Sequence, residues 1–170
     1  MNRKIHIAPF EMKYLDDYYR GFNEEITKYQ WPDPFGSIDE AREMLQEFLD
    51  EMEQGETLLY SILSEDDRFL GSVEIHGLSG ECPEVGIWVA EHEQHKGYAF
   101  EALNALLSRV RDQYGKTCFF YEADIRNQSS MKLLQKFSEN YEITDKGTEK
   151  LTTDSGKELE LGGFELKLKA

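Results

Sequence analysis

The chain has few cysteines and no long apolar run. Its two cysteines, Cys82 and Cys118, lie far apart in the sequence and outside any Cys-x-x-Cys spacing. We therefore predict neither a zinc site nor a redox motif, and interpret both as buried or incidental thiols. The basic start of the chain lacks the apolar run of a signal peptide, and no later segment approaches the ~20 apolar residues of a membrane span. These absences predict a cytoplasmic protein.

Basic residues are also scarce. Lysine and arginine total 19 against 34 aspartate and glutamate residues, which gives a net charge of −15. Nucleic acids and anionic membranes are bound through clusters of lysine and arginine, so the charge argues against both as partners. A cationic partner fits this balance better, although acidity that serves solubility alone explains it equally well.

Several signatures of catalysis and ligand binding are missing. No glycine-rich nucleotide fingerprint and no Ser-His-Asp or Cys-His arrangement stands out, so we do not expect covalent catalysis. His92 and His95 are three residues apart among glutamates, but they lack the His-Glu-x-x-His spacing and further ligands. We therefore predict no metal site.

The hydrophobic periodicity predicts a single domain over residues 1–170, with alternating strands and helices. Ser37 and Glu40 form a capping box for one helix, and Gly55 ends it. Strands are expected over 4–9, 57–63, 69–76, 83–90 and 117–125, with two closing antiparallel strands in the tail, and helices over 11–19 and after Ser37, Gly97 and Asn127. This order predicts an α/β (α+β) fold with one mixed sheet flanked by helices.

Two segments between these elements concern a ligand. The segment Gly21–Gly36 carries Tyr29, Trp31 and Phe35 beside two glutamates, and it either lines an acceptor site or packs on the core as an ordinary connection. In the strand over 69–76, alternation places Leu70, Ser72, Glu74 and His76 on one face and Phe69, Gly71, Val73 and Ile75 on the other. Two ionisable groups thus point the same way.

Residues 84–99 carry the strongest functional signal. The apolar strand Glu84–Ala90 is joined to a helix through a loop that ends in Gln94-x-x-Gly97-x-Ala99. The free N–H groups and the dipole at a helix start bind phosphate, and Gly97 removes the side chain where a ligand must approach. Because Lys96 is the only lysine in this loop, a diphosphate would depend on backbone N–H groups.

These residues resemble the GNAT superfamily of acetyl-CoA-dependent N-acetyltransferases. The resemblance rests on the strand Glu84–Ala90, the Gln94-x-x-Gly97-x-Ala99 turn and Asn127-x-x-Ser130 at the head of the next helix, and the element order agrees. Glu-Val-Gly-Ile-Trp-Val and Asn-Gln-Ser-Ser-Met-Lys-Leu-Leu-Gln-Lys are most similar to the branch that acetylates ribosomal-protein N-termini, together with relatives that act on small amines.

The resemblance implies that acetyl-CoA is the cosubstrate. The N–H groups from His95 to Ala99 are expected to cradle the pyrophosphate, and the pantetheine arm to pair with the strand at Ile87 to Val89, where a bulge would splay the strands. Residues expected to contact the coenzyme are Ile87, Trp88, Val89, Gln94, His95, Lys96, Gly97, Tyr98, Ala99 and Asn127.

Acetyl transfer also needs a neutral amine, so a nearby carboxylate is expected to take the proton. Glu84 is the first candidate and Glu74 the next, and for each the alternative is an ordinary exposed charge. A backbone N–H near Val89 is expected to bind the oxygen of the tetrahedral intermediate. Asn127 or Ser130 would hydrogen-bond the leaving sulfur, or Asn127 would only cap its helix.

Two departures from the family pattern stand in the same region. Many members carry a tyrosine seven residues after the capping asparagine, and Leu134 stands there in this chain. The usual Gly-Phe pair at the end of that helix is replaced by residues 137–141, Phe-Ser-Glu-Asn-Tyr. Leucine cannot protonate a thiolate. The resemblance therefore identifies acetyl-CoA as the acetyl donor but does not identify the group that protonates the leaving thiolate.

The predicted function is therefore an N-acetyltransferase that acts on a protein N-terminus or a basic small molecule. Transfer of a longer acyl group is a second interpretation. The third is an acetyl-CoA-binding sensor or assembly module without turnover, which Leu134 favours. The sequence leaves the acceptor and the oligomeric state, including a homodimer, open.

Overall fold

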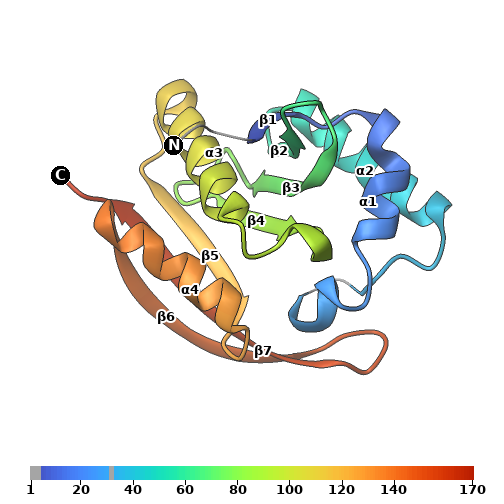
Figure 1. Ribbon diagram of the computed structural model, residues 1–170. Helices are drawn as coiled ribbons and strands as arrows, with labels where there is room; N and C mark the ends of the chain where they lie inside the picture. The colour runs from blue at the N-terminus through green and yellow to red at the C-terminus, as the bar shows by residue number, and fades with distance from the viewer. Residues whose placement is uncertain (1–4, 31–32) are drawn as a thin grey trace.

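The computed structural model describes residues 5–30 and 33–170, so Lys4 and Trp31 lie outside the described residues. Its helices and strands follow the predicted order (Figure 1). They are β1 (Ile5–Pro9), α1 (Leu15–Gly21), α2 (Ile38–Glu53), β2 (Thr57–Ser64), β3 (Phe69–His76), β4 (Glu84–Val89), α3 (Tyr98–Tyr114), β5 (Cys118–Asp124), α4 (Gln128–Lys136), β6 (Tyr141–Thr152) and β7 (Glu158–Leu168).

The predicted ends of the elements need small changes. The helix expected over 11–19 is a short 3₁₀ turn, Met12–Tyr14, that continues into α1 and ends later than expected, at Gly21. The segment between α1 and α2 contains one 3₁₀ turn, Ile26–Tyr29. The capping box of α2 is confirmed: the Ser37 hydroxyl accepts the Glu40 N–H at 3.2 Å, and Glu40 reaches back to the N–H of Gly36 at 2.7 Å.

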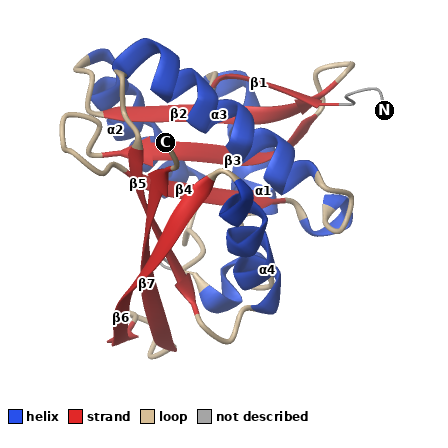
Figure 2. Cartoon of the chain, turned by 90° about the vertical axis from the view of Figure 1, so that its left-hand side faces the viewer, coloured by secondary structure: helices blue, strands red, loops and turns tan. Residues whose placement is uncertain are grey.

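The strands form one seven-stranded sheet in the order β1-β2-β3-β4-β5-β7-β6. Each neighbouring pair is antiparallel except β4 and β5, which are parallel. Figure 2 shows β1 to β4 running across the view while β5 to β7 run downward, so the sheet changes direction at the boundary between β4 and β5. The mixed sheet with helices on both faces is the predicted α/β fold.

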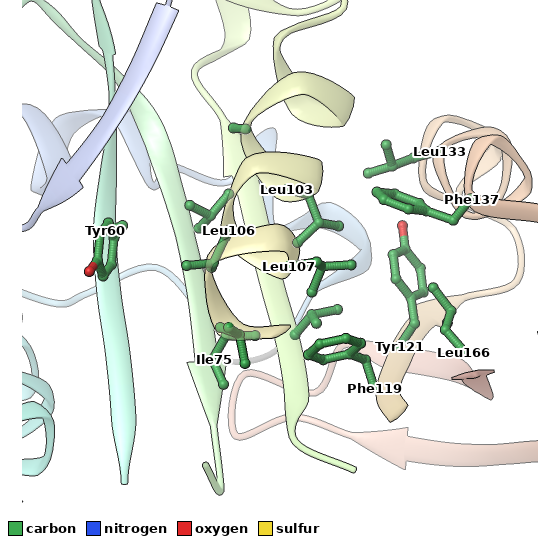
Figure 3. Packing of buried hydrophobic residues seen from close by; sticks show 14 of the residues in the cluster. Tyr60, Ile75, Leu103, Leu106, Leu107, Phe119, Tyr121, Leu133, Phe137 and Leu166 are labelled. Carbon is green, nitrogen blue, oxygen red and sulfur yellow. The ribbon is translucent and has the colours of Figure 1, made fainter. Parts of the chain in front are cut away.

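Each face of the sheet carries its own hydrophobic core. On one face, α3 packs with α4 through leucines that include Leu103, Leu106 and Leu107, which Figure 3 shows directed toward the strands. On the other face, α1 and α2 pack over aromatic residues that include Tyr18, Phe69 and Trp88. Both faces of the sheet are thus covered by helices.

A register shift corrects the predicted faces of β3. Ile62 pairs with Gly71 but Leu63 pairs with Phe69, so Leu70 is an extra residue opposite β2. Leu70 therefore joins the core beneath α3, and Phe69 joins the core beneath α1 and α2. Strict alternation places both residues on the opposite faces, because it cannot anticipate a bulge. The shared face of Glu74 and His76 is confirmed, since their side chains lie 3.1 Å apart.

The interpretation of the cysteines as separate thiols is wrong. Cys82 and Cys118 form a disulfide, although 36 positions separate them in the sequence. The parallel pairing of Glu84 with Phe120 brings together the two cysteines, each of which precedes its member of this pair by two residues. Sequence spacing alone does not show this. Disulfides are rare in the cytosol, and the cytoplasmic location stays a prediction. Within the described ranges, no helix is long and apolar enough to cross a membrane.

Candidate active site

The break between β4 and β5 forms the centre of the site. The two strands pair only at Glu84 with Phe120 and at Val85 with Tyr121. In contrast, β4 stays paired with β3 along its whole length, from His76 opposite Glu84 to Gly71 opposite Val89. The strands thus separate with no register shift between β3 and β4, so the splay expected from the family resemblance is present without the bulge expected to cause it.

The backbone of β4 is available to a ligand on its open edge. The N–H of Ala90 donates to the carbonyl of Leu70 on β3 at 2.8 Å. Because successive residues of a strand direct their N–H and C=O groups to opposite edges, those of Ile87 and Val89 point away from β3. The backbone of Trp88 faces β3, and its largely buried ring packs against Tyr18 and Phe22.

The start of α3 lies at one end of this opening. Gly97 precedes the helix with φ of +85°, a left-handed conformation that glycine adopts easily, and no side chain caps the helix. The N–H of Glu101 donates to the carbonyl of Gly97 in the first turn of the helix. The N–H groups of Tyr98, Ala99 and Phe100 are therefore available to an anion. A Cβ built on Gly97 meets no atom within 4 Å, so the approach is open.

Gln94 and Lys96 shape this loop rather than extending into it. The Gln94 amide donates to the carbonyl of Val89 at 3.1 Å, which ties the loop to the end of β4. The Lys96 ammonium donates to the Glu93 carboxylate at 2.9 Å, and Arg68 binds the same carboxylate. Two cations hold the pKa of Glu93 below its usual value. The charge of Lys96 is thus already paired, which strengthens the expectation that backbone groups bind the diphosphate.

A cavity of about 590 Å³ joins the α3 start to β4. Its lining includes nine of the ten residues predicted to contact the coenzyme, with Lys96 outside it. Three lysines that the sequence reasoning missed also line it: Lys28, Lys132 and Lys136. Lys132 and Lys136 are four residues apart and so share one face of α4, and this spacing after the capping Asn127 was the signal that could have found them.

A second cavity, of about 430 Å³, lies at the other end of the opening. It shares six lining residues with the first: Tyr29, Gln30, Ile87, Trp88, Asn127 and Ser130. Four carboxylates that line it, Glu74, Glu84, Glu122 and Asp124, give it an acidic wall, and rings including those of Tyr18, Phe22 and Phe48 add aromatic faces. The structure thus brings all four predicted catalytic residues, Glu74, Glu84, Asn127 and Ser130, around one space.

The carboxylates of this second cavity differ in their surroundings. Asp124 is fully buried and carries a bidentate pair with Arg126, so its charge is neutralised. Desolvation raises the pKa of Glu84, and the neighbouring His76 partly opposes this shift. Desolvation together with the charges of Glu84 and Glu149 raises the pKa of Glu122. At Glu84 desolvation thus outweighs the positive charge of His76, and at Glu122 the neighbouring charges are themselves negative.

The segment between α1 and α2 closes over both cavities. Lys157, in the turn between β6 and β7, donates to the carbonyls of Thr27 and Gln30 at 2.5 and 2.8 Å and pairs with Asp33 at 3.3 Å. Figure 1 shows this hairpin turn beside the segment that follows α1. Tyr29 and Gln30 line both cavities, whereas Phe22, Ile26 and Phe35 pack in or against the core beneath α1 and α2. The packing interpretation thus holds for part of this segment, the acceptor site stays a prediction, and Trp31 lies outside the described residues.

The structure also locates the predicted departures around α4. Asn127 caps the helix by accepting the N–H of Ser130 at 3.2 Å, and this cap uses only its amide oxygen. Leu134 is fully buried in the core beneath α3 and lines neither cavity. Residues 137–139 form a 3₁₀ turn in place of the usual helix exit. Tyr121 lines the second cavity, but its hydroxyl donates to the carbonyl of Ser130 at 2.9 Å, and burial raises its pKa far above the ordinary value.

Comparison with known proteins agrees with this geometry. The model of the acetyltransferase (GNAT) domain family matches residues 4–137. The uncharacterized N-acetyltransferase p20 of Bacillus licheniformis is 27% identical over 117 residues, which span 67% of this chain and 66% of that protein.

Solved structures show the same fold. A spermidine N-acetyltransferase from Vibrio cholerae, in complex with CoA and spermine, has a TM-score of 0.81 at 17% identity and covers 98% of this chain and 97% of its own. RimL, a ribosomal alpha-N-protein acetyltransferase in complex with coenzyme A, has a TM-score of 0.82 at 15% identity, with 98% and 96% covered. Acetyltransferases of small amines and of ribosomal-protein N-termini thus have similar TM-scores and identities to this chain, so the comparison does not distinguish between the two branches. With most of its length matched by the family model, this chain belongs to the GNAT family of acetyltransferases.

Proposed function

We propose that this protein transfers an acetyl group from acetyl-CoA to the primary amine of a cationic acceptor. The observation that carries the proposal is the opening between β4 and β5, which joins the uncapped start of α3 to an acidic cavity. A thioester placed in this opening from one side would meet an amine that enters from the other. We also propose that residues 1–170 act as one domain, because Lys157 near the C-terminus holds the segment that walls both cavities.

The residues around the opening fit acetyl-CoA. The free N–H groups at the start of α3 would bind the diphosphate, and the open edge of β4 at Ile87 would pair with the amides of the pantetheine arm as an added strand. An N–H on the open edge of β4, that of Val89, would donate to the thioester oxygen as its negative charge develops. Asn127 and Ser130 line both cavities and are the proposed hydrogen-bonding partners of the sulfur.

The second cavity fits an amine that carries positive charge. Glu74, Glu84 and Glu122 would attract the cation, and the rings of Tyr18, Phe22 and Tyr29 line the same space and can present their faces to it. A protein N-terminus and a basic small molecule both meet this description. The net charge of −15 would also increase the encounter rate of either one at low salt.

An amine panel tests the proposed function. We expect acetyl-CoA to release its thiol in the presence of primary amines that carry a second cationic group, and much less with amines that carry a carboxylate, which the acidic wall repels. Thiol release, with the mass of the acetylated product as confirmation, measures both. Equal rates for the two kinds of amine would contradict the cationic acceptor, while a response to longer acyl-CoA donors alone would contradict the acetyl donor.

Two of the three lysines of the first cavity, both on α4, give a separate prediction about the coenzyme. We expect Lys132→Ala combined with Lys136→Ala to weaken acetyl-CoA binding by about 3- to 10-fold, because two solvent-exposed charge contacts with phosphate are lost. The loss should shrink as salt is added. Calorimetric titration measures it, and Lys146→Ala with Lys150→Ala, on β6, is a control with the same change of net charge. Equal affinity in the α4 variant and the wild-type protein would remove these lysines from the site.

A second function is favoured by one specific observation. Leu134 is fully buried where many family members carry a tyrosine, so the usual proton donor to the thiolate is missing. A domain that binds acetyl-CoA as a sensor or assembly module would tolerate this change. Tight coenzyme binding with no thiol release on any amine of the panel would favour this alternative over the enzyme.

A further inference from the structure

We propose that Glu74 and His76 form a proton relay, in which Glu74 takes a proton from the acceptor amine and His76 passes it to solvent. The inference rests on the proposed function, because it assigns a role within the same site. The sequence offered Glu84 and Glu74 as bases and gave His76 no role. In the structure these three groups differ in how deeply they are buried and in whether they contact one another.

Glu74 occupies the inner position. It is 8% exposed, lines the acidic cavity and lies directly opposite Gly86 on β4. A Cβ built on Gly86 would make ordinary van der Waals contact with the Glu74 side chain, 3.9 Å from its carboxylate, so this side chain lies directly beside the backbone of β4. Gly86 follows the last pairing of β4 with β5, so Glu74 lies beside the point where these two strands separate. A carboxylate at this position can reach an amine that attacks a thioester held along Ile87.

His76 occupies the outer position and contacts Glu74 directly. Its Nε2 atom lies 3.1 Å from Oε1 of Glu74, and its side chain is 32% exposed against 11% for that of Glu74. Phe48 of α2 packs edge-on against the imidazole with ring centroids 5.0 Å apart, which restrains its orientation. A proton on Glu74 therefore has a hydrogen-bonded route along β3 toward water.

The charges that face His76 come from three elements. Glu74 lies on β3 itself, Glu84 is the cross-strand partner on β4, and Glu51 is on α2. Burial alone would lower the pKa of His76, but the hydrogen bond and charge of Glu74, with the charges of Glu84 and Glu51, raise it above 6.5 overall. A relay through this imidazole is blocked while it is protonated, so the rate should rise with pH through an apparent pKa above 6.5.

Glu84 differs from Glu74 in its burial and in its place along the strands. It is exposed at the first residue of β4, where that strand still pairs with β5. It faces the same cavity and adds to the field that attracts a cation. We therefore assign Glu84 to acceptor binding and Glu74 to contact with the reacting amine.

The proton and bond changes balance without a further reactant. The ammonium gives one proton to Glu74, which passes it to Nε2 of His76, and the opposite ring nitrogen releases a proton to water. The neutral nitrogen then forms the N–C bond with the acetyl carbonyl as the C–S bond breaks. The second proton leaves the nitrogen and goes to the departing thiolate, so the products are an acetamide and free thiol.

The test compares two variants with two acceptors of the same charge pattern but different amine pKa. For an alkyl amine of pKa ~10, nearly all molecules must lose a proton to the enzyme, whereas an α-amino group of pKa ~8 is partly neutral already. We expect Glu74→Gln to lower kcat by about 100-fold and His76→Gln by about tenfold with the alkyl amine, with smaller losses for the α-amine. The wild-type kcat/KM should rise with pH as His76 loses its proton. His76→Gln should remove this rise from the pH profile.

Two controls separate a relay from general damage. His6→Gln removes another histidine with a carboxylate partner, Asp67 at 3.1 Å, on the distant strand β1, and should leave kcat and the pH profile unchanged. Glu84→Gln should raise KM for the acceptor with a small effect on kcat. Acetyl-CoA binding, measured by calorimetry, should be the same in all variants.

The outcomes distinguish this inference from the proposed function. An active wild-type protein whose pH profile is unchanged by His76→Gln would overturn the relay and leave the acetyltransferase intact. Loss of the acidic limb in Glu84→Gln alone would also overturn it, in favour of Glu84 as the base. A wild-type protein that binds acetyl-CoA but acetylates no amine would overturn the proposed function itself.

Discussion

Replacing Gly97 with glutamate is expected to abolish acetyl-CoA binding and leave the protein folded. Gly97 has φ of +85°, and a Cβ on it would project into open space at the start of α3. The added carboxylate would lie where the free N–H groups of Tyr98, Ala99 and Phe100 attract an anion. It would therefore fill the space of the diphosphate and repel its negative charge. Calorimetric titration with acetyl-CoA measures the loss, and circular dichroism measures the fold.

The opposite end of the same helix offers a matched control. Gly115 follows α3 with φ of +67° and likewise has no atom within 4 Å of a Cβ built on it. Gly115→Glu therefore pays a similar backbone strain, of about 1–2 kcal/mol, at a distance of roughly 25 Å along the helix. It should bind acetyl-CoA normally. Equal loss of affinity in both variants, or normal affinity in Gly97→Glu, would show that the start of α3 is not the diphosphate site.

Removing the disulfide is expected to give the largest change in stability. Cys82 and Cys118 close a loop with a sequence separation of 36, and they stand just before the only two paired positions of β4 and β5. Loss of a crosslink of this length should lower the free energy of unfolding by about 2–4 kcal/mol. For a domain of this size the midpoint of thermal unfolding should fall by roughly 5–15 °C.

Thermal unfolding of the wild-type protein and of the Cys82→Ser, Cys118→Ser variant, each with and without a reductant, measures this effect. The reductant should destabilise the wild-type protein to the level of the variant and leave the variant unchanged. Two free thiols by mass spectrometry in the purified protein, or a midpoint that the reductant does not move, would argue that the bond does not support the fold.

Local sequence signals predicted the fold and the coenzyme end of the site. Capping by Ser37 and Asn127, the positive φ required of Gly97 and the apolar periodicities each act within a few residues, so they are readable without tertiary structure. The element order followed directly from these signals.

The remaining features depend on strand register and on contacts between distant segments. The bulge at Leu70, the disulfide and the separation of β4 from β5 follow from how the strands pair, which alternation within one strand does not determine. The contact of Lys157 with Thr27 joins residues 130 positions apart. The acidic cavity is lined by residues of β3, β4 and β5, so it could not be predicted before the pairing of these strands was known.

The central claim is that the opening between β4 and β5 joins an acetyl-CoA site to a site for a cationic amine. Its most direct measurement is thiol release from acetyl-CoA with a diamine, followed by the mass of the product, in the wild-type protein and in Gly97→Glu. The account predicts an acetylated diamine and released thiol with the wild-type protein, and neither with the variant. Acetyl-CoA binding without any acetylated amine, or acetylation that persists in Gly97→Glu, would contradict it.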